Sequence, residues 1–234
     1  MSKVIIFGAG KIADQAYFYL TNDSSHEIVA FTVDEEYIIK PELFGVPVIP
    51  FEGIENKYPS GDFSMFIAVG YQNLNKFRSS KYFAAKGKGY ELISYVSSRA
   101  SNFGNVEIGD NCFILENTVI QPCSKIGSNV FLWSGNHVGH HATVGDHCYI
   151  AGQVVISGNT VIGSSCFIGV NATIGHELTI GAESIIGAGC LITKNVEAKS
   201  VYIAEDTPKY RLESPSFLKL TKLSERSRTK GIEV

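Results

Sequence analysis

The stretch that decides the fold is IGSSCFIGVNATIG, residues 162–175. Within it an aliphatic residue returns at every sixth position, and each of these residues is followed by glycine. The same spacing runs in both directions without a slip, through Ile108, Ile114, Ile120, Ile126, Leu132, Val138, Val144, Ile150, Ile156, Ile162, Ile168, Ile174, Ile180, Ile186 and Ile192. A strict period of six matches neither the roughly 3.6-residue period of a helix nor the plain alternation of a strand.

This period predicts a solenoid in which each six-residue unit forms one short strand and one corner. The residue two positions before each aliphatic is mostly small, and alternation along an extended segment points both side chains inward. Glycine follows most of the aliphatic residues, and we expect it to turn the corner at conformations that a Cβ disfavours. Three units close one coil, so the series makes about five stacked coils with aliphatic ladders inside.

Composition excludes several classes of protein. The chain has 234 residues, and 20 Lys and Arg against 23 Asp and Glu give a net charge of -3, so no basic surface for nucleic acid is expected. No apolar run reaches the roughly 18 residues of a membrane span. The first residues lead straight into an apolar strand without the longer stretch of a signal peptide. We therefore expect a cytoplasmic protein that does not insert into membranes.

The five cysteines are assigned by the repeat. Cys112, Cys148, Cys166 and Cys190 all occupy the small inward position, while Cys123 lies outside it. A buried free thiol behaves as a small hydrophobic group. The sequence therefore predicts structural thiols rather than disulfides, and it contains no CxxC pair of a zinc ribbon.

The residues before the repeat alternate apolar strands with helical segments, which predicts a small parallel α/β sheet. Strands are expected at 4–7, 27–33, 46–48 and 64–70, with helices after the first and the last. Gly8 and Gly10, with Ala13 three residues later, stand between strand and helix as in the Rossmann-type fingerprint. Such a helix N-terminus offers free N–H groups to an anion. Asp34 ends the second strand, where it can accept hydrogen bonds from hydroxyl or base N–H groups.

This first domain is too short for the double unit that holds a dinucleotide. It fits a mononucleotide better, which disfavours hydride transfer. The alternative is a packing domain whose glycines only make a tight turn, because a single fingerprint of this kind is a weak signal.

Five of the six histidines lie in the repeat, namely His137, His140, His141, His147 and His176. His140 is the second residue after Val138, which is a corner position that need not be buried. His176, followed by Glu177, stands two coils later in the same column. Gly158 lies between them and leaves space beside the wall of the solenoid.

The whole arrangement resembles the hexapeptide-repeat sugar N- and O-acetyltransferases of bacillosamine, perosamine and sialic-acid pathways. The matching segments are Gly8-Ala9-Gly10, Phe31-x-x-Asp34, Ile67-Ala68-Val69-Gly70, Val138-Gly139-His140-His141, and residues 167–172 and 185–189. The resemblance implies an α/β N-terminal Rossmann-like domain over residues 1–98 that binds a nucleotide sugar. It implies an all-β left-handed parallel β-helix over residues 99–200 and a C-terminal tail over 201–234. It also implies a homotrimer with acetyl-CoA along the groove between subunits, no metal, and a role in lipopolysaccharide or other surface-glycan biosynthesis.

When the repeats are aligned, the resemblance implies that the family's general base is His140 in this chain. Histidine suits that role, because imidazole titrates near neutral pH and can take the proton of an attacking amine. The family often places an acidic residue next, where this chain has His141. His141 could orient His140, and Asp146 or Glu116 are alternatives for that role. His176 with Glu177 is a rival dyad.

The resemblance also assigns the binding residues. For the nucleotide sugar they are Gly8, Gly10, Lys11, Asp34 and Gly70. For the coenzyme they are Tyr149, Gly158, Val161, Gly169 and Gly187.

The predicted reaction is acetyl transfer from acetyl-CoA to the amino group of a nucleotide-linked deoxysugar. O-acetylation of a sugar such as sialic acid is the alternative. A trimeric β-helix carbonic anhydrase, with three histidines on zinc, would leave the first domain without a role. A scaffold without catalysis is a further alternative.

Two expectations concern surfaces. The aromatic residues Phe113, Phe131, Tyr149 and Phe167 are spaced so that they form one outward column. From such an apolar stripe we predict an obligate trimer that covers it. Residues 214–230 are expected to form a short helix that caps the last coil.

Overall fold

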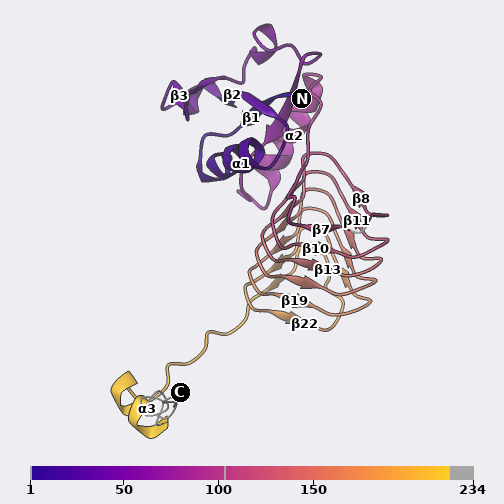
Figure 1. Ribbon diagram of the computed structural model, residues 1–234. Helices are drawn as coiled ribbons and strands as arrows, with labels where there is room; N and C mark the ends of the chain where they lie inside the picture. Colours follow the sequence, from indigo (N-terminus) through magenta and orange to yellow (C-terminus); the bar gives the residue numbers. More distant parts are fainter. Residues whose placement is uncertain (1, 103, 222–234) are drawn as a thin grey trace, which may run out of the picture. The chain divides into compact units, whose positions relative to one another are not determined.

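The computed structural model describes residues 2–102 and 104–221. Residues 1–204 form one compact unit, and residues 205–234 form a second that is described separately. The first unit contains an α/β domain followed by a solenoid of short parallel strands (Figure 1).

The α/β domain has a five-stranded sheet in the order β3-β4-β2-β1-β5. Its strands are β1 (Lys3–Phe7), β2 (Glu27–Val33), β3 (Glu42–Leu43), β4 (Val46–Pro50) and β5 (Phe63–Ile67). All neighbours are parallel except the β3–β4 hairpin at one edge, which the sequence did not predict. The helices are α1 (Lys11–Asn22) and α2 (Lys76–Gly87), with short 3-10 turns at η1 (Glu35–Tyr37) and η2 (Ile54–Asn56).

The continuous apolar run in β1 is buried on both faces of the sheet. Val4 and Ile6 pack in a cluster with α1, whereas Ile5 and Phe7 pack in a second cluster with α2. A strand covered on both sides needs no polar alternation, which is why the run reads as apolar throughout.

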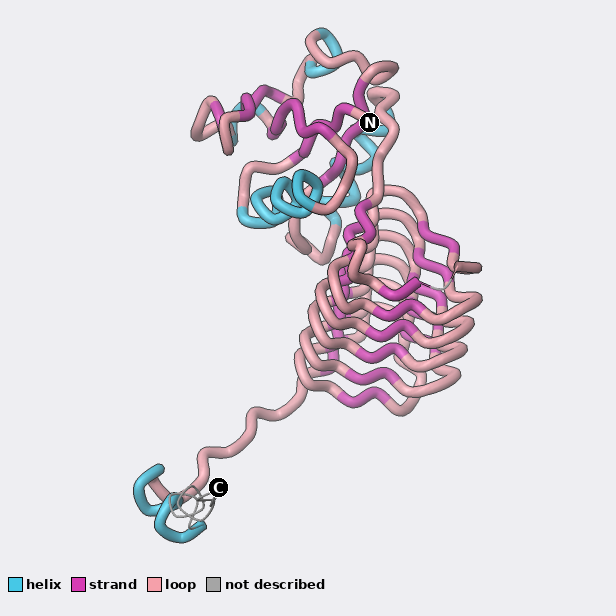
Figure 2. Tube along the Cα trace, in the orientation of Figure 1, coloured by secondary structure: helices cyan, strands magenta, loops and turns pink. Residues whose placement is uncertain are grey.

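The predicted solenoid is confirmed as a parallel β-helix, whose coils stack as Figure 2 shows. The aromatic face consists of β6 (Tyr95–Val96), β9 (Phe113–Ile114), β12 (Phe131–Leu132), β15 (Tyr149–Ile150), β18 (Phe167–Ile168), β21 (Ile185–Ile186) and β23 (Val201–Tyr202). The second face consists of β7 (Ser101–Asn102), β10 (Val119–Ile120), β13 (His137–Val138), β16 (Val155–Ile156), β19 (Thr173–Ile174) and β22 (Leu191–Ile192). The third face consists of β8 (Glu107–Ile108), β11 (Lys125–Ile126), β14 (Thr143–Val144), β17 (Val161–Ile162) and β20 (Thr179–Ile180).

Each predicted aliphatic residue is the second residue of one of these strands and packs into the interior of the coils. The small residues two positions earlier line the same core, including Cys112, Cys148, Cys166 and Cys190, which are free and buried. Cys123 is free and exposed. The predicted thiol positions are therefore confirmed.

The prediction that the glycine after each aliphatic residue turns the corner is wrong. The left-handed backbone lies at the third residue after the aliphatic, for example at Asn171 with φ 58° and His141 with φ 59°. The glycine directly after the aliphatic is required instead by the next coil: a Cβ on Gly163 would lie 2.5 Å from the backbone nitrogen of Ala182. Close stacking of coils, rather than the turn, excludes a side chain there.

The aromatic column is covered by the first domain of the same chain. The prediction that this column is exposed and needs a trimer to cover it is therefore wrong. Phe113 is 1% exposed, Phe131 is 0% exposed and Tyr149 is 6% exposed. The ring of Phe66 from β5 lies 5.4 Å from Phe113 and 6.2 Å from Phe131. The aromatic column therefore packs between the two domains of one chain, and no second subunit is needed to cover it.

A buried arginine fastens the domains together. The Arg78 guanidinium, from α2, donates hydrogen bonds to the carbonyl oxygens of Gly70, Asn129, His147 and Cys148 at 2.9–3.3 Å. It also lies 4.5 Å from the centre of the Phe131 ring, which is a cation–π contact. Burial lowers its pKa to about 10.

The second unit contains α3 (Ser214–Thr221), whose apolar side chains are exposed. The rest of the helix predicted over 214–230 lies outside the described residues. Over the described part of the chain, none of the helices has the length and apolar character that crossing a membrane requires.

Candidate active site

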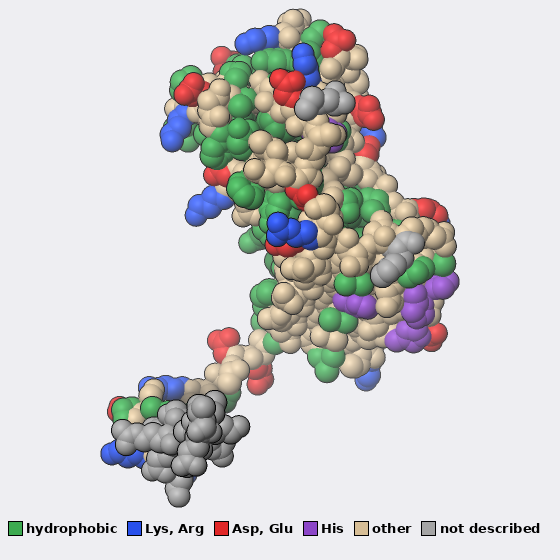
Figure 3. All heavy atoms as spheres, viewed as in Figure 1, with side chains coloured by type: hydrophobic (Ala, Val, Ile, Leu, Met, Phe, Trp, Pro, Cys, Tyr) green, Lys and Arg blue, Asp and Glu red, His purple; other side chains and the backbone are tan. Residues whose placement is uncertain are grey.

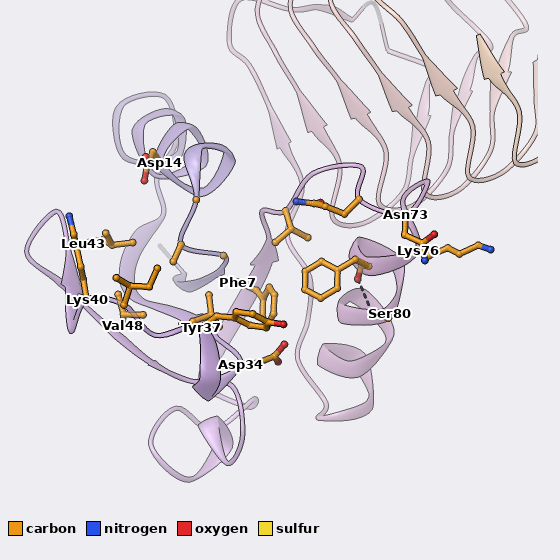
Figure 4. Close-up of a pocket in the computed structure, with 18 residues that line it drawn as sticks. Phe7, Asp14, Asp34, Tyr37, Lys40, Leu43, Val48, Asn73, Lys76 and Ser80 are labelled. Carbon is orange, nitrogen blue, oxygen red and sulfur yellow. Dashed lines mark hydrogen bonds between the residues drawn. The ribbon is translucent and has the colours of Figure 1, made fainter. Parts of the chain in front are cut away.

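A cavity of about 960 Å³ lies in the α/β domain, where β1, β2 and β5 end. Gly8 follows β1, Asp34 follows β2, and Val69 lies just beyond β5. The carboxyl ends of parallel strands are where open α/β sheets bind ligands. Figure 4 shows the side chains that surround this cavity.

The glycine turn forms one wall of the cavity. Gly8 has φ +135°, and a Cβ there would lie 2.6 Å from the carbonyl oxygen of Ala68. Its N–H donates to the carbonyl oxygen of Thr32 at 2.8 Å. Gly10 precedes α1, and a Cβ at Gly10 would meet nothing within 4 Å. Gly8 is thus required by packing, whereas Gly10 leaves open space beside the helix N-terminus.

The substrate residues implied by the resemblance are only partly brought together. Gly8, Gly10 and Asp34 line the cavity, but Lys11 and Gly70 are not among its lining residues. Gly70 instead receives a hydrogen bond from Arg78, and a Cβ there would come within 3.2 Å of Ile12. Its role is in packing between β5 and α1.

Asp34 is held by a cation. Its Oδ1 lies 2.5 Å from Nζ of Lys81, and both side chains are under one-fifth exposed, at 17% and 18%. The Lys81 ammonium is itself packed over the rings of Phe7, Phe51 and Phe77 at 5.4–5.7 Å. The pair fixes the carboxylate and leaves Oδ2 as the acceptor for a ligand hydroxyl or N–H group.

Several lining residues were not singled out from the sequence. Tyr37 and Lys40 come from the segment between β2 and β3, and Gln72, Asn73 and Lys76 come from the segment after β5. The rule that ligands bind beyond the carboxyl ends of strands would have found the second group, because it follows a predicted strand.

A second cluster lies at the corner between the second and third faces of the β-helix, and we call it the histidine corner. It comprises His140, His141, Gly158, His176 and Glu177. Nδ1 of His140 lies 3.1 Å from Nδ1 of His141, and the backbone N–H of His140 donates to Oε1 of Gln121 at 2.8 Å. One imidazole must donate and the other accept, which fixes the orientation of both rings.

Gly158 makes room for the His140 ring. A Cβ on Gly158 would lie 2.7 Å from Nε2 of His140. The ring of His176 reaches the same place, with its centre 6.1 Å from that of His140, and its Nε2 lies 3.3 Å from Oε1 of Glu177. The structure therefore brings the predicted base and the rival dyad into one cluster.

The alternative orienting carboxylates are engaged elsewhere. Glu116 accepts hydrogen bonds from Tyr19 at 2.9 Å and Ser134 at 2.7 Å. Asp146 accepts from the backbone N–H of Ser128 at 2.7 Å. This leaves His141 as the residue in contact with Nδ1 of His140.

The remaining histidines of the repeat do not join this cluster. His137 lies half-buried on β13. His147 bonds to Asn129 at 2.9 Å beneath α2, and burial lowers its pKa. Among residues 2–102 and 104–221, no group of three or more His, Cys, Asp or Glu is arranged to hold a metal ion.

The coenzyme residues implied by the resemblance occupy different corners of one chain. Gly158 lies at the histidine corner and Val161 is exposed on the third face. Gly169 and Gly187 follow strands of the aromatic face, at its corner with the second face. Tyr149 is buried against Tyr71 at 4.9 Å and Phe167 at 5.8 Å, so its ring is enclosed by the first domain rather than open to a ligand.

The cavity and His140 lie on opposite sides of the β-helix. The first domain covers the aromatic face, and the histidine corner joins the other two faces. The residues that line the cavity all belong to the first domain. Figure 3 shows histidines gathered on the β-helix, away from that domain.

Residues 123–158 and 159–194 match the family model of the bacterial transferase hexapeptide (six repeats). Both matched stretches lie within the β-helix. A search of curated proteins gave no match for the sequence.

Solved structures share this fold over most of the chain. A variant of perosamine N-acetyltransferase from Caulobacter crescentus, in complex with CoA and GDP-perosamine, has a TM-score of 0.79 and 22% identity, covering 87% of this chain and 94% of that chain. The acetyltransferase domain of PglB from Neisseria gonorrhoeae, in complex with acetyl coenzyme A, has a TM-score of 0.74 and 22% identity, covering 85% and 94%. WeeI from Acinetobacter baumannii has a TM-score of 0.74 and 21% identity, covering 87% and 97%.

Proposed function

We propose that this protein transfers the acetyl group of acetyl-CoA to the amino group of a nucleotide-linked amino-deoxysugar, in the cytoplasmic synthesis of a surface glycan such as lipopolysaccharide. The observation that carries the proposal is the pairing of two sites in one fold. A nucleotide-sized cavity lies at the carboxyl ends of the first sheet, and an exposed imidazole with a fixed partner lies on the β-helix.

The similar structures support this assignment. One is a perosamine N-acetyltransferase with CoA and GDP-perosamine, and another is an acetyltransferase domain with acetyl coenzyme A. Both match over more than four-fifths of this chain, at 87% and 85%, so they include both the cavity domain and the β-helix.

In the proposed mechanism, Nε2 of His140 takes a proton from the sugar amine as its nitrogen attacks the thioester carbonyl. The new C–N bond forms, the C–S bond breaks, and His140 passes the proton to the leaving thiolate. His141 holds Nδ1 of His140 and thereby aims Nε2. A backbone N–H of the β-helix would stabilise the oxyanion.

A homotrimer completes the site. Because the cavity and His140 lie on opposite sides of one chain, the cavity of one copy must work with His140 of a neighbour. The coenzyme would then lie in the groove where the histidine corner of one copy, with Gly158 and Val161, meets Gly169 and Gly187 of the next. In this assembly the first domain is the Rossmann-like nucleotide-sugar domain, residues 1–98, and the β-helix, residues 99–200, is left-handed.

Incubation with acetyl-CoA and a panel of nucleotide-linked amino sugars, followed by mass spectrometry, tests this function. We expect one acetyl group on an amino sugar that carries a nucleotide, and none on the same sugar without it. Acetylation of a hydroxyl group would instead support the sugar O-acetyltransferase. A panel in which no sugar gains an acetyl group would contradict both.

A further inference from the structure

A column of polar residues runs along the β-helix corner between the third face and the aromatic face. Its members are Asn111, Asn129 and His147, each 18 residues after the one before, and we call them the junction ladder. All three have left-handed backbone, with φ 53°, 58° and 61°. Both asparagines are 0% exposed. Buried polar side chains need hydrogen-bond partners, and here the partners include the first domain.

One end of the junction ladder is bonded to the sheet of the first domain. The backbone N–H of Ile67, the last residue of β5, donates to Oδ1 of Asn111 at 2.8 Å, and Nδ2 of Asn111 donates back to the Ile67 carbonyl oxygen at 3.3 Å. This pair of bonds fixes the orientation of the Asn111 amide. Val69, two residues after Ile67, lines the cavity. The ladder therefore holds the strand that leads into the cavity wall.

The orientation of the Asn129 amide is fixed as well. Its Oδ1 accepts from Nδ2 of Asn111 at 2.8 Å and from Nε of Arg78 at 3.2 Å, and both of these nitrogens can only donate. The amide nitrogen of Asn129 therefore faces Nδ1 of His147, which is 2.9 Å away. Because an amide nitrogen also only donates, Nδ1 must be the acceptor. The ladder thus requires a neutral His147 whose proton is on Nε2.

The His147 ring is enclosed by α2 of the first domain. The centres of the Tyr82 and Phe83 rings lie 5.3 Å and 5.4 Å from its centre, and both rings meet it edge to face. The backbone carbonyl oxygen of His147 accepts a hydrogen bond from Arg78 at 2.9 Å. The side chain and the backbone of this one residue therefore both contribute to the contact between the domains.

Charged groups act on the His147 ring in opposite directions. Burial, the largest effect, disfavours the imidazolium, and so does the Arg78 guanidinium. The carboxylates of Asp110 and Asp146 favour it, although Asp110 is already paired with Lys86 of α2. The balance lowers the pKa of His147 from its ordinary value.

We propose that His147 is a proton-dependent switch in the docking of the first domain on the β-helix. The neutral ring accepts from Asn129 and completes the junction ladder. A proton on Nδ1 would face the amide N–H of Asn129, so that two donors oppose each other and the bond is lost. The Asn129 amide cannot turn over to compensate, because Arg78 and Asn111 both need its oxygen. This inference does not depend on the proposed reaction.

The pH range of the switch follows from the direction of the pKa change. An unperturbed histidine titrates at about pH 6.5, and the folded-state pKa of His147 lies below that value. The bond from Asn129 to His147 therefore stabilises the docked state fully above about pH 6.5. This stabilisation is lost as the pH falls from there through the folded-state pKa.

His147→Asn separates the ladder from its titration. Asparagine tolerates left-handed backbone, and Asn129 already accepts from Asn111 one coil earlier, so the variant extends the ladder with a group that does not titrate. Urea denaturation of the full-length protein is followed by the fluorescence of Trp133, the single tryptophan, which packs against Tyr149 at the domain junction. Between about pH 7.5 and about pH 5, the urea midpoint of wild type should fall further than that of His147→Asn.

His137→Asn is the control, because His137 lies on β13 and is not part of the junction ladder. Its midpoint should keep a constant difference from that of wild type over the same pH range. Nitrogen NMR of the wild type with isotope-labelled histidine is a second measurement, in which the His147 signals are those missing from His147→Asn. They should show Nδ1 without a proton at neutral pH. A protonated Nδ1 would overturn the inference, and so would an equal pH dependence of wild type and His147→Asn.

Discussion

His140 can act as a base only through Nε2, because its Nδ1 lies 3.1 Å from Nδ1 of His141. Gly158 leaves room for the ring, because a Cβ there would lie 2.7 Å from Nε2. A base that is already oriented loses little entropy on reaching the transition state, so the effect of removing it should appear in turnover rather than in binding.

Replacement of His140 by asparagine should lower kcat by about 10²–10⁴-fold, the usual contribution of a general base. The Michaelis constants and the melting temperature should stay close to those of wild type, since the side chain is exposed at a corner. Steady-state kinetics with acetyl-CoA and the acceptor sugar would measure this. His176→Ala is the control, and a loss of turnover there but not in His140→Asn would move the base to the dyad with Glu177.

Gly158→Ala provides a test of geometry without removing any reacting group. The added Cβ would lie 2.7 Å from Nε2 of His140, so the ring must move and kcat should fall at least about tenfold. Gly163→Ala is the contrasting variant, because its Cβ would meet the backbone of the next coil at 2.5 Å. We expect it to lower the melting temperature instead. The account fails here if Gly158→Ala retains full turnover.

At the scale of elements, α2 joins the two domains through one buried cation. Arg78 is 0% exposed and donates to four backbone carbonyl oxygens and to Oδ1 of Asn129, and none of these five acceptors is a carboxylate. Backbone carbonyls thus replace the water that this charge loses on folding, at the junction between β-helix and first domain.

Arg78→Met should destabilise the protein by about 3 kcal/mol, because several buried carbonyls lose a donor together. Lys86→Met, which removes the exposed pair of Lys86 with Asp110, should cost about 1 kcal/mol or less. Urea denaturation of the two variants beside wild type measures both values. Equal midpoints for the two variants would show that the guanidinium does not fasten the domains.

Asp23, which follows α1, links the C-terminal end of that helix to β6 and to Ser98 just after it. Hydrogen bonds from Ser98 and Tyr95 lower the pKa of Asp23 to about 2. Because the folded-state pKa lies below the unfolded value, this bond network stabilises the protein above about pH 4, and the stabilisation is lost as the pH falls toward about 2. The stability difference between wild type and Asp23→Asn should therefore shrink over that range. A difference that is independent of pH would contradict the assignment.

The sequence predicted the β-helix well because one local constraint is repeated at every sixth position, so each aliphatic such as Ile168 confirms the next. The sequence analysis gave the wrong reason for the glycine after each aliphatic residue. Close approach to the next coil and a left-handed turn both favour glycine, so the sequence alone does not distinguish them. The burial of Phe131 and the position of Arg78 could not be predicted, because a period does not say what covers a face. The left-handed backbone at Asn73, Leu74 and Asn75 could not be predicted either, because no glycine marks it and the buried Asn75 side chain is bonded to a β-helix carbonyl.

At the scale of the whole molecule, one chain keeps the cavity and His140 apart. The cavity belongs to the domain on the aromatic face, and His140 lies at the opposite corner of the β-helix. A working site then needs the cavity of one copy and the histidine of another, which is the reason for the proposed trimer.

Activity of hybrid trimers tests this claim most directly. His140→Asn removes the base, and Gly10→Trp fills the cavity at a position where a side chain has open space. The two variants, carrying different affinity tags, are produced together and purified through both tags. Each mixed trimer has one interface where an unaltered cavity meets an unaltered His140, so we predict about a third of wild-type acetyl transfer from two parents that are almost inactive. Mixed trimers as inactive as their parents would contradict the account.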